Sequence, residues 1–406
     1  MTMADQKQPE KTFRLSMLIY DTRYRSMTIQ VIALMLLMLV GAWLVSNTLH
    51  NLAALDKELG FGFLSEPSSY DINQRLIEYD SRSTHGRAAL VGILNTLLVA
   101  VLGCALATVI GVFAGVARLS KNWIIGRLMT VYIEMFRNIP VLLWIVLMMA
   151  IFIETLPMPR AFKGDDPTAT MYLGDSVAFT NRGFYIPKPL FNDGSMVVVV
   201  VFLLSLVGIF VFGKWSKKRQ ALTGDILPNG WIKTGIFFIP AVLAFFVMGQ
   251  PIGLEYPELK GFNFKGGLHL RNSLIALWLA LSFYTGAFIA EAVRAGIQAV
   301  SKGQSEAAAA LGLRPNRTMS LVILPQALRV IIPPLISQYL NLTKNSSLAI
   351  AVGYMDITAT LGGITLNQTG REMESLLILM AMYLSISVSV SIFMNWYNES
   401  IKMRER

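Results

Sequence analysis

Eight long apolar runs constrain this chain more than any other feature of its sequence. A helix needs about 20 apolar residues to cross a bilayer, and the need to satisfy backbone groups in lipid restricts spanning structures to helices and closed barrels. The sequence therefore predicts an all-α membrane protein with about eight transmembrane helices. The runs lie near residues 27–48, 87–116, 123–153, 196–213, 234–250, 271–296, 328–352 and 372–395.

The composition agrees with a chain whose main solvent is lipid. Of the 406 residues, 54% are hydrophobic and 15% are charged, whereas a soluble domain carries about 25% charged residues. An ordinary soluble enzyme and a disordered chain are therefore excluded. The formal charge of +10 is typical of basic loops on the inner side of a membrane. We expect the lipid bilayer as a partner and no nucleic acid.

The basic residues are unevenly shared between the loops, and this predicts the orientation. Eight spans place both termini on one side, where the loops carry 18 Lys and Arg residues against 10 on the other side. Loops rich in Lys and Arg stay in the cytoplasm, so we expect both termini there. The first run is longer than a signal-peptide core of about 7–15 residues, so we expect a retained helix rather than a cleaved signal.

The seventh run, 328–352, differs from the others because it contains Arg329, Pro333, Pro334 and Lys344. Proline frees backbone groups that neighbouring protein must satisfy within a membrane. The sequence therefore predicts an interior and irregular helix here.

Motifs for bond chemistry are missing from the sequence. No G-x-x-x-x-G-K-[ST] phosphate loop is present, so we do not expect the chain to bind ATP by that route. His50, His85 and His269 lack metal-ligand spacing, and Cys104 alone forms neither a disulfide nor a cysteine metal site. We expect no catalytic residue, no metal and no cofactor in this chain.

The most informative stretch lies in a predicted cytoplasmic loop, residues 301–325. Ser305 can cap a helix that starts at Glu306, an acidic residue suited to a helix N-terminus. Ala307–Ala310 are the best helix formers. Gly312 then fits the left-handed position after a helix, and Leu313 can make the hydrophobic contact that accompanies it. A short helix nearly bare of side chains suits close docking into a groove, although it also serves as a plain connector.

A second helix is expected to follow this turn. Pro315 stops any continuation of the first helix, and Asn316 or Thr318 can cap the next one. That helix would run through Leu324 and Pro325 into the membrane. The loop 297–327 therefore predicts a compact helix-turn-helix bracket.

This stretch resembles the EAA loop of ATP-binding-cassette importer permeases, whose pattern is E-A-A-x₃-G-x₉-I-x-L-P. Glu306, Ala307, Ala308 and Gly312 match it, and Val322 replaces the isoleucine. The resemblance implies that the loop holds a coupling helix, which inserts into a cleft on a separate ATPase subunit. The implied coupling residues are Ser305, Glu306, Ala307, Ala308, Gly312, Leu313 and Arg314.

The flanking segments are similar to permeases of the polar-amino-acid (histidine/glutamine) family. The segments that carry this resemblance are 94–97, 137–140, 284–291, 294–297, 325–329 and 344–348. The larger form, together with 365–371, resembles the broad-specificity general L-amino-acid permeases of proteobacteria. The resemblance implies an inner-membrane location and a permease core at 87–153 and 271–395.

The expected organisation has four parts. They are a cytoplasmic segment 1–26, an extra helix with its periplasmic loop at 27–86, a permease domain at 87–395 with an inserted helix pair at 196–250, and a cytoplasmic tail at 396–406.

Ionisable residues at membrane depth are costly and indicate function by default. Glu134 and Arg137 have i,i+3 spacing and can pair, or Arg137 can bind a substrate carboxylate through two hydrogen bonds. Glu291 and Arg294 share this spacing, so Glu291 either pairs with Arg294 or meets a substrate ammonium group.

Uncharged polar residues extend the candidate pathway. Contacts between helices explain Asn and Ser in such positions, but a line of them also suits the path of a zwitterion. The candidate pathway residues are Asn95, Thr96, Glu134, Arg137, Tyr284, Glu291, Lys344, Asn345, Ser346 and Ser347.

The resemblance implies an alternating-access mechanism driven from outside this chain. Two permease subunits, identical or homologous, would enclose the substrate, an ATPase pair would hold ATP and Mg²⁺, and a periplasmic amino-acid-binding protein would deliver the substrate. The alternatives are a self-contained ion-coupled secondary transporter, for which Glu134 is the best mid-membrane carboxylate, and a polytopic membrane enzyme.

Overall fold

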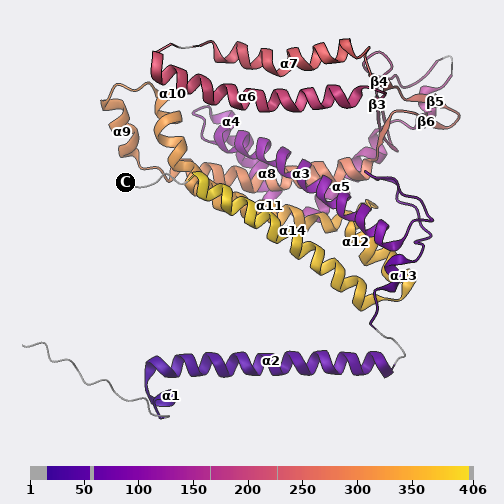
Figure 1. Ribbon diagram of the computed structural model, residues 1–406, viewed down its shortest axis with the longest axis vertical. Coiled ribbons are helices and arrows are strands. Elements are labelled where there is room, and N and C mark those ends of the chain that lie inside the picture. The colour runs from indigo at the N-terminus through magenta and orange to yellow at the C-terminus, as the bar shows by residue number, and fades with distance from the viewer. Residues whose placement is uncertain (1–15, 55–58, 165, 226, 402–406) are drawn as a thin grey trace, which may run out of the picture. The chain divides into compact units, whose positions relative to one another are not determined.

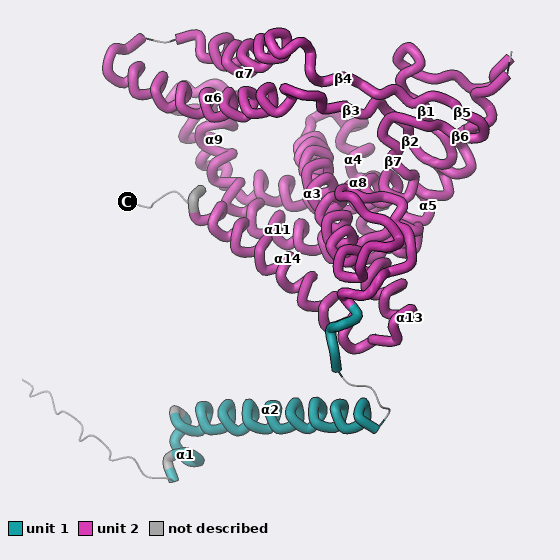
Figure 2. The backbone as a smooth tube through the Cα atoms, turned by 45° about the vertical axis from the view of Figure 1, so that its right-hand side comes forward, with its two compact units in different colours: residues 1–63 teal, residues 64–406 magenta. Residues whose placement is uncertain are grey.

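The computed structural model describes residues 16–54, 59–164, 166–225 and 227–401, and it divides into two compact units, 1–63 and 64–406 (Figure 2). Within the described residues, eight helices are long and apolar enough to cross a membrane. The predicted fold class is confirmed. In the first unit, α1 spans Met17–Tyr20 and α2 spans Thr22–Ala54.

The second unit holds the remaining helices (Figure 1). The long ones are α3 (His85–Arg118), α4 (Trp123–Asn138), α5 (Val141–Thr155), α6 (Ser195–Thr223), α7 (Asn229–Val247), α8 (Asn272–Gln298), α11 (Leu324–Asn345) and α14 (Glu372–Ile401). The short ones are α9 (Lys302–Ala310), α10 (Pro315–Thr318), α12 (Ile357–Ala359) and α13 (Leu366–Thr369).

Helix α8 is the centre of the second unit, because α3, α4, α5 and α11 all pack against it. Small residues allow this close approach. A Cβ atom on Gly115 of α3 would lie 2.6 Å from the carbonyl oxygen of Ala290, and one on Gly111 would lie 2.5 Å from the Cβ of Ile289. The core is therefore held by backbone-to-backbone contact, which larger side chains at these glycines would prevent.

The third apolar run is not one helix, so the expectation of a single span over 123–153 is wrong. It breaks into α4 and α5 at Ile139 and Pro140, where Ile139 adopts extended backbone with φ −106° and ψ 134°. A residue before proline is disfavoured in the helical region. The spanning helix of this run begins at Val141.

The seventh run is irregular, as predicted. A π-helical turn at Met319–Ile323 precedes α11, and a 3₁₀ segment at Ser346–Val352 follows it. The prediction of an interior helix is correct for one face only, because Ile331 and Ile332 are buried whereas Val330 is exposed.

Short strands gather at one end of the second unit, in the segments between α5 and α6 and between α7 and α8 (Figure 1). β1 (Ala178–Thr180), β2 (Gly183–Ile186) and β7 (Leu268–Leu270) form an antiparallel sheet, in which Tyr185 opposes both Ala178 and His269. β3 (Lys188–Phe191) pairs with β4 (Ile252–Glu255), and β5 (Glu258–Lys260) pairs with β6 (Asn263–Lys265). Because β3 precedes α6 and β4 follows α7, this pairing closes α6 and α7 into an antiparallel helix pair.

We call this end the strand end, with its loops 64–84, 156–194, 248–271 and 353–371. The opposite end, with 119–122, 224–228 and 299–318, is called the bracket end.

Candidate functional site

The bracket at 301–318 is formed by α9 and α10, which come from the residues expected to form it. Helix α9 ends at Ala310, and Gly312 follows in the left-handed region with φ +75°. The Leu313 amide donates to Ala308 and the Gly312 amide donates to Ala309, which is the hydrogen-bond pattern of a Schellman cap. The predicted left-handed role of Gly312 is confirmed.

The start of this helix corrects the sequence prediction. Helix α9 begins at Lys302 after an extended Ser301, so Ser305 and Glu306 lie inside the helix and Ser305 does not cap it. Ser301 is the cap residue by its extended backbone, although its side chain makes no capping hydrogen bond. The second helix also begins earlier than expected: Arg314 is its cap residue and Pro315 its first residue, because proline fits the first helical position as well as it stops a helix.

The bracket presents a mixed surface. Glu306, Ala307, Arg314 and the 81%-exposed Leu311 are exposed, whereas Ala308 is buried. The Gln326 amide of α11 donates to Gln304 Oε1 at 3.1 Å, which ties α9 to the helix that follows it. The helix is therefore tied to the bundle, while Ala307, Ala309 and Ala310 stay exposed.

A cluster of charges joins three helices near the bracket end. Glu291 of α8 accepts hydrogen bonds from Arg294, one turn away, and from Arg118 Nη1 of α3 at 2.6 Å. Arg118 Nη2 also lies 3.7 Å from Glu134 Oε1 of α4. Of the two alternatives left open for Glu291, the structure contains the pair with Arg294. Sequence reasoning missed Arg118, whose position as the last residue of an apolar helix is the signal that could have found it.

The expected pairing of Glu134 with Arg137 is not what the structure contains. Glu134 faces Arg118 and accepts from the Asn138 amide at 3.3 Å, whereas the Arg137 guanidinium lies over the Phe288 ring at 5.4 Å. The i,i+3 spacing allowed a pair, but Arg118 of a neighbouring helix occupies that place. Arg137 is exposed, and Tyr284, half-buried on α8, has its ring 5.1 Å from the Phe288 ring.

At the strand end, Asn95 and Thr96 are fully buried in α3 and hold backbone from other segments. Asn95 Nδ2 donates at 2.8 Å to the carbonyls of Gln74 and Met355, and Thr96 Oγ1 accepts from the Ile357 amide at 3.2 Å. These contacts position the loop between α11 and α14. They leave no exposed face on either side chain in this conformation.

Asp356 anchors the same loop, and sequence reasoning missed it. Its carboxylate accepts from the Ala359 amide at 2.9 Å and from the Tyr383 hydroxyl of α14 at 3.1 Å. The side chain is fully buried, and this burial raises the pKa of Asp356 to about 6. The available signal was a single acidic residue in the loop 353–371, placed before a short helix that it caps.

The polar group 344–347 ends α11. Lys344 is exposed, Asn345 and Ser347 are half-buried, and Ser346 is buried. The hydroxyls of Ser346 and Ser347 donate at 2.8 Å to the carbonyls of Thr343 and Lys344. The structure thus brings Asn95 and Thr96 together at the strand end and Glu134 and Glu291 around Arg118, and it places Lys344 in neither group.

Comparison with known proteins now decides the family. Residues 107–403 match the family described as "Binding-protein-dependent transport system inner membrane component". The chain belongs to this family. It is a permease subunit of an ATP-binding-cassette importer and not an enzyme, as predicted. Permeases of this family work with an ATPase, a second permease and a binding protein, and they are multi-pass membrane proteins.

Full-length relatives of this permease give the same result. It is 52% identical to the glutamate/glutamine/aspartate/asparagine transport system permease protein BztB of Rhodobacter capsulatus, over 98% of both chains. It is 46% identical to the general L-amino acid transport system permease protein AapQ of Rhizobium johnstonii, over 97% of this chain and 96% of the relative. A putative amino-acid ABC transporter permease, YhdX of Escherichia coli, is 43% identical over 94% and 95%. The alternative of a self-contained ion-coupled transporter gains no support.

Proposed function

We propose that this permease carries a broad range of L-amino acids into the cell across the bacterial inner membrane. The observation that carries the proposal is full-length similarity to permeases that are named for amino acids. The α9 bracket adds a physical reason to expect an external motor, because its exposed alanine face is held rigidly by the Schellman cap at Gly312.

Energy enters, in this proposal, through partners at the bracket end. A separate ATPase pair binds ATP and Mg²⁺, which this chain does not, and closes around the coupling residues 305–308 and 312–314. Nucleotide state biases two arrangements of the helices that differ by a few kcal/mol. The bracket end and both termini then face the cytoplasm, and a periplasmic amino-acid-binding protein delivers substrate at the strand end.

The substrate follows a path along α3, α4, α8 and α11 in this proposal. The exposed Arg137 is suited to the carboxylate of a zwitterion, whereas Glu291 is held by Arg118 and Arg294 and keeps the helices along the path together. The exposed Lys344 and the half-buried Asn345 and Ser347 would face the second permease, identical or homologous, across the path.

Affinity purification from detergent-solubilised membranes, followed by mass spectrometry and transport in proteoliposomes, tests the proposal. We expect an ATPase subunit to copurify and amino-acid uptake to require ATP. A second, homologous permease among the copurified chains indicates a heterodimer, and its absence indicates a homodimer. Uptake by the isolated chain without an ATPase would contradict the proposal and favour the ion-coupled transporter.

A further inference from the structure

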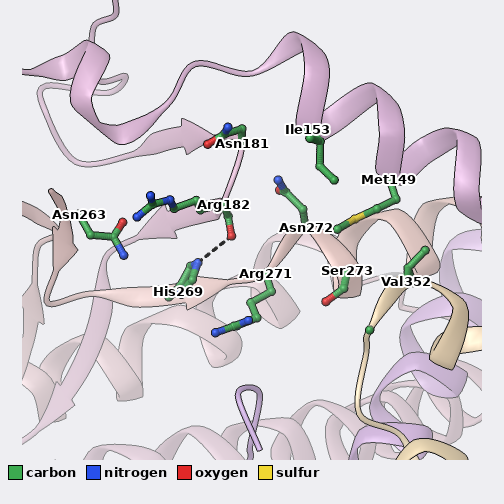
Figure 3. Close-up of a pocket in the computed structure, with 11 residues that line it drawn as sticks. Met149, Ile153, Asn181, Arg182, Asn263, His269, Arg271, Asn272, Ser273 and Val352 are labelled. Carbon is green, nitrogen blue, oxygen red and sulfur yellow. Dashed lines mark hydrogen bonds between the residues drawn. The ribbon is translucent and has the colours of Figure 1, made fainter.

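A cavity of about 560 Å³ lies at the strand end, and none of the candidate pathway or coupling residues lines it. It lies between α5, the start of α8, the turn at Gly353, the turn between β1 and β2, and the strands β6 and β7 (Figure 3). Met149 and Ile153 of α5 form an apolar wall. The volume is within the range of small-molecule sites, about 300–1,000 Å³.

The charge of the lining has one sign. Arg182 and Arg271 line the cavity, and no acidic side chain of the described residues does so. His269 also lines it and stacks on the Tyr185 ring, with centroids 4.3 Å apart. Burial, with a smaller contribution from the Arg271 charge, lowers the pKa of His269, and its Nε2 donates to the Arg182 carbonyl at 3.2 Å.

A charged donor without a hydrogen-bond partner belongs to the lining of this space. Arg271 Nε is buried and has no hydrogen-bond partner in the described residues, which is costly for a charged donor. Asn272 and Ser273, the first residues of α8, also line the cavity. The first amides of a helix have no acceptor within it and carry its positive end. Arginine and a helix N-terminus together favour a carboxylate.

Two hydrogen-bond acceptors that receive no hydrogen bond lie in the same lining. Asn272 is 2% exposed, and its Nδ2 donates to the Thr180 carbonyl at 3.2 Å, which leaves Oδ1 buried without a donor. Asn181 Oδ1 is likewise buried and unpartnered. In Figure 3 the Asn272 side chain points toward the side where Asn181 lies, whereas the Arg271 side chain leads away from both. These two acceptor oxygens belong to the same lining as the two arginines, and they fit the ammonium group of a zwitterion.

We infer that this cavity is an entrance subsite that binds a free amino acid, preferably an acidic one, before it reaches the path between the helices. The inference rests on the proposed function. A protein side chain docking here would supply a carboxylate without an ammonium group, and so would leave the Asn181 and Asn272 oxygens unmet. The doubly cationic lining favours an amino acid of net charge −1 and disfavours a basic one.

The test measures equilibrium binding of radiolabelled L-glutamate, L-glutamine and L-lysine to the complete importer in lipid nanodiscs, without its binding protein. We expect L-glutamate to bind at least about tenfold more tightly than L-lysine. Arg271→Gln and Arg182→Gln should each weaken L-glutamate binding about tenfold, the loss expected for one charged hydrogen bond.

Arg160→Gln is the matched control, because Arg160 is exposed at the same end and does not line the cavity. Arg182 is exposed, and the hydrogen bonds seen at this residue are made by its main chain. Arg182→Gln therefore decides the question if Arg271→Gln does not fold.

Failure of the subsite and failure of the proposed function give different results. L-glutamate binding that is absent, or equal in Arg182→Gln and Arg160→Gln, overturns the subsite while ATP-driven uptake persists. Unchanged amino-acid binding with weaker capture of the purified binding protein by Arg182→Gln also overturns it, and assigns the cavity to docking. A wild-type importer that takes up no amino acid contradicts the proposed function itself.

Discussion

Glu291 is the residue at which α3 and α8 are joined by charge. It is shared by Arg118 and Arg294, and 26% of its side chain is exposed. Glu134 also faces Arg118, but at 3.7 Å and with 52% of its side chain exposed. A short, half-buried ion pair is screened less by water than an exposed one. The two carboxylates should therefore differ in their contribution to stability.

Glu291→Gln is expected to lower the free energy of unfolding by about 2 kcal/mol, because two arginines lose their charged acceptor. Glu134→Gln, the control, should cost less than about 1 kcal/mol. Unfolding of the purified protein by SDS in mixed micelles measures both. Equal losses would show that Glu291 does not join the helices in the way described.

Asp356 makes stability depend on pH. Its folded pKa of about 6 lies above the ordinary value of 3.8, so the folded protein binds a proton more readily than the unfolded chain. Stability should therefore rise as pH falls from 7 to 5, by about 1 kcal/mol from this group. Asp356→Asn should remove that contribution.

Melting temperatures of the wild type and of Asp356→Asn at pH 7 and pH 5 measure this effect. The wild type should gain more than the variant on acidification, since the other titrating groups are common to both. A difference between the two proteins that does not change with pH would contradict the role given to burial.

Among the elements, α9 depends on one glycine for its C-terminal cap. Gly312 has φ +75°, and a Cβ atom added there would meet no other atom within 4 Å, so a side chain at this position is opposed by backbone strain rather than by a clash. Gly312→Val should cost about 1–2 kcal/mol locally and weaken ATPase copurification severalfold. Gly303→Ala is the control, since Gly303 lies in α9 with open space around it. Copurification equal to wild type in Gly312→Val would contradict docking through the bracket.

The sequence predicts elements better than it predicts contacts between them. Apolar length located the eight spans, and the positive φ of Gly312 follows from its place after four alanines. The sequence also contains the signal for the break at Pro140, because the residue before a proline is disfavoured in the helical region. Interpreting this run by its hydropathy alone missed that signal. The partners of Glu134 and Asn95 could not be predicted, because Arg118 and Met355 reach them from other segments. The buried polar atoms without hydrogen-bond partners around Arg271 could not be predicted either, because they depend on how the three-stranded sheet lies against the start of α8.

At the scale of the whole molecule, the distribution of Lys and Arg predicts one orientation. Cys104 is the single cysteine, so Cys104→Ser gives a cysteine-free background. A cysteine at the exposed Asn73 should react with a membrane-impermeant maleimide in intact spheroplasts, whereas one at the exposed Ala310 should react only after permeabilisation. Labelling in the opposite order would reverse the proposed orientation of the strand end and the bracket end.

The three-stranded sheet brings together the two ends of a long segment. The Asn181 main-chain amide donates to Pro157 beyond the end of α5, and the Asn272 side chain at the start of α8 donates to the Thr180 carbonyl. Thr180 and Asn181, which are consecutive, thus link the two points at which the segment 158–271 leaves the core and rejoins it. Because these points are neighbours, a chimaera that exchanges this segment between permeases is expected to keep the host's core intact.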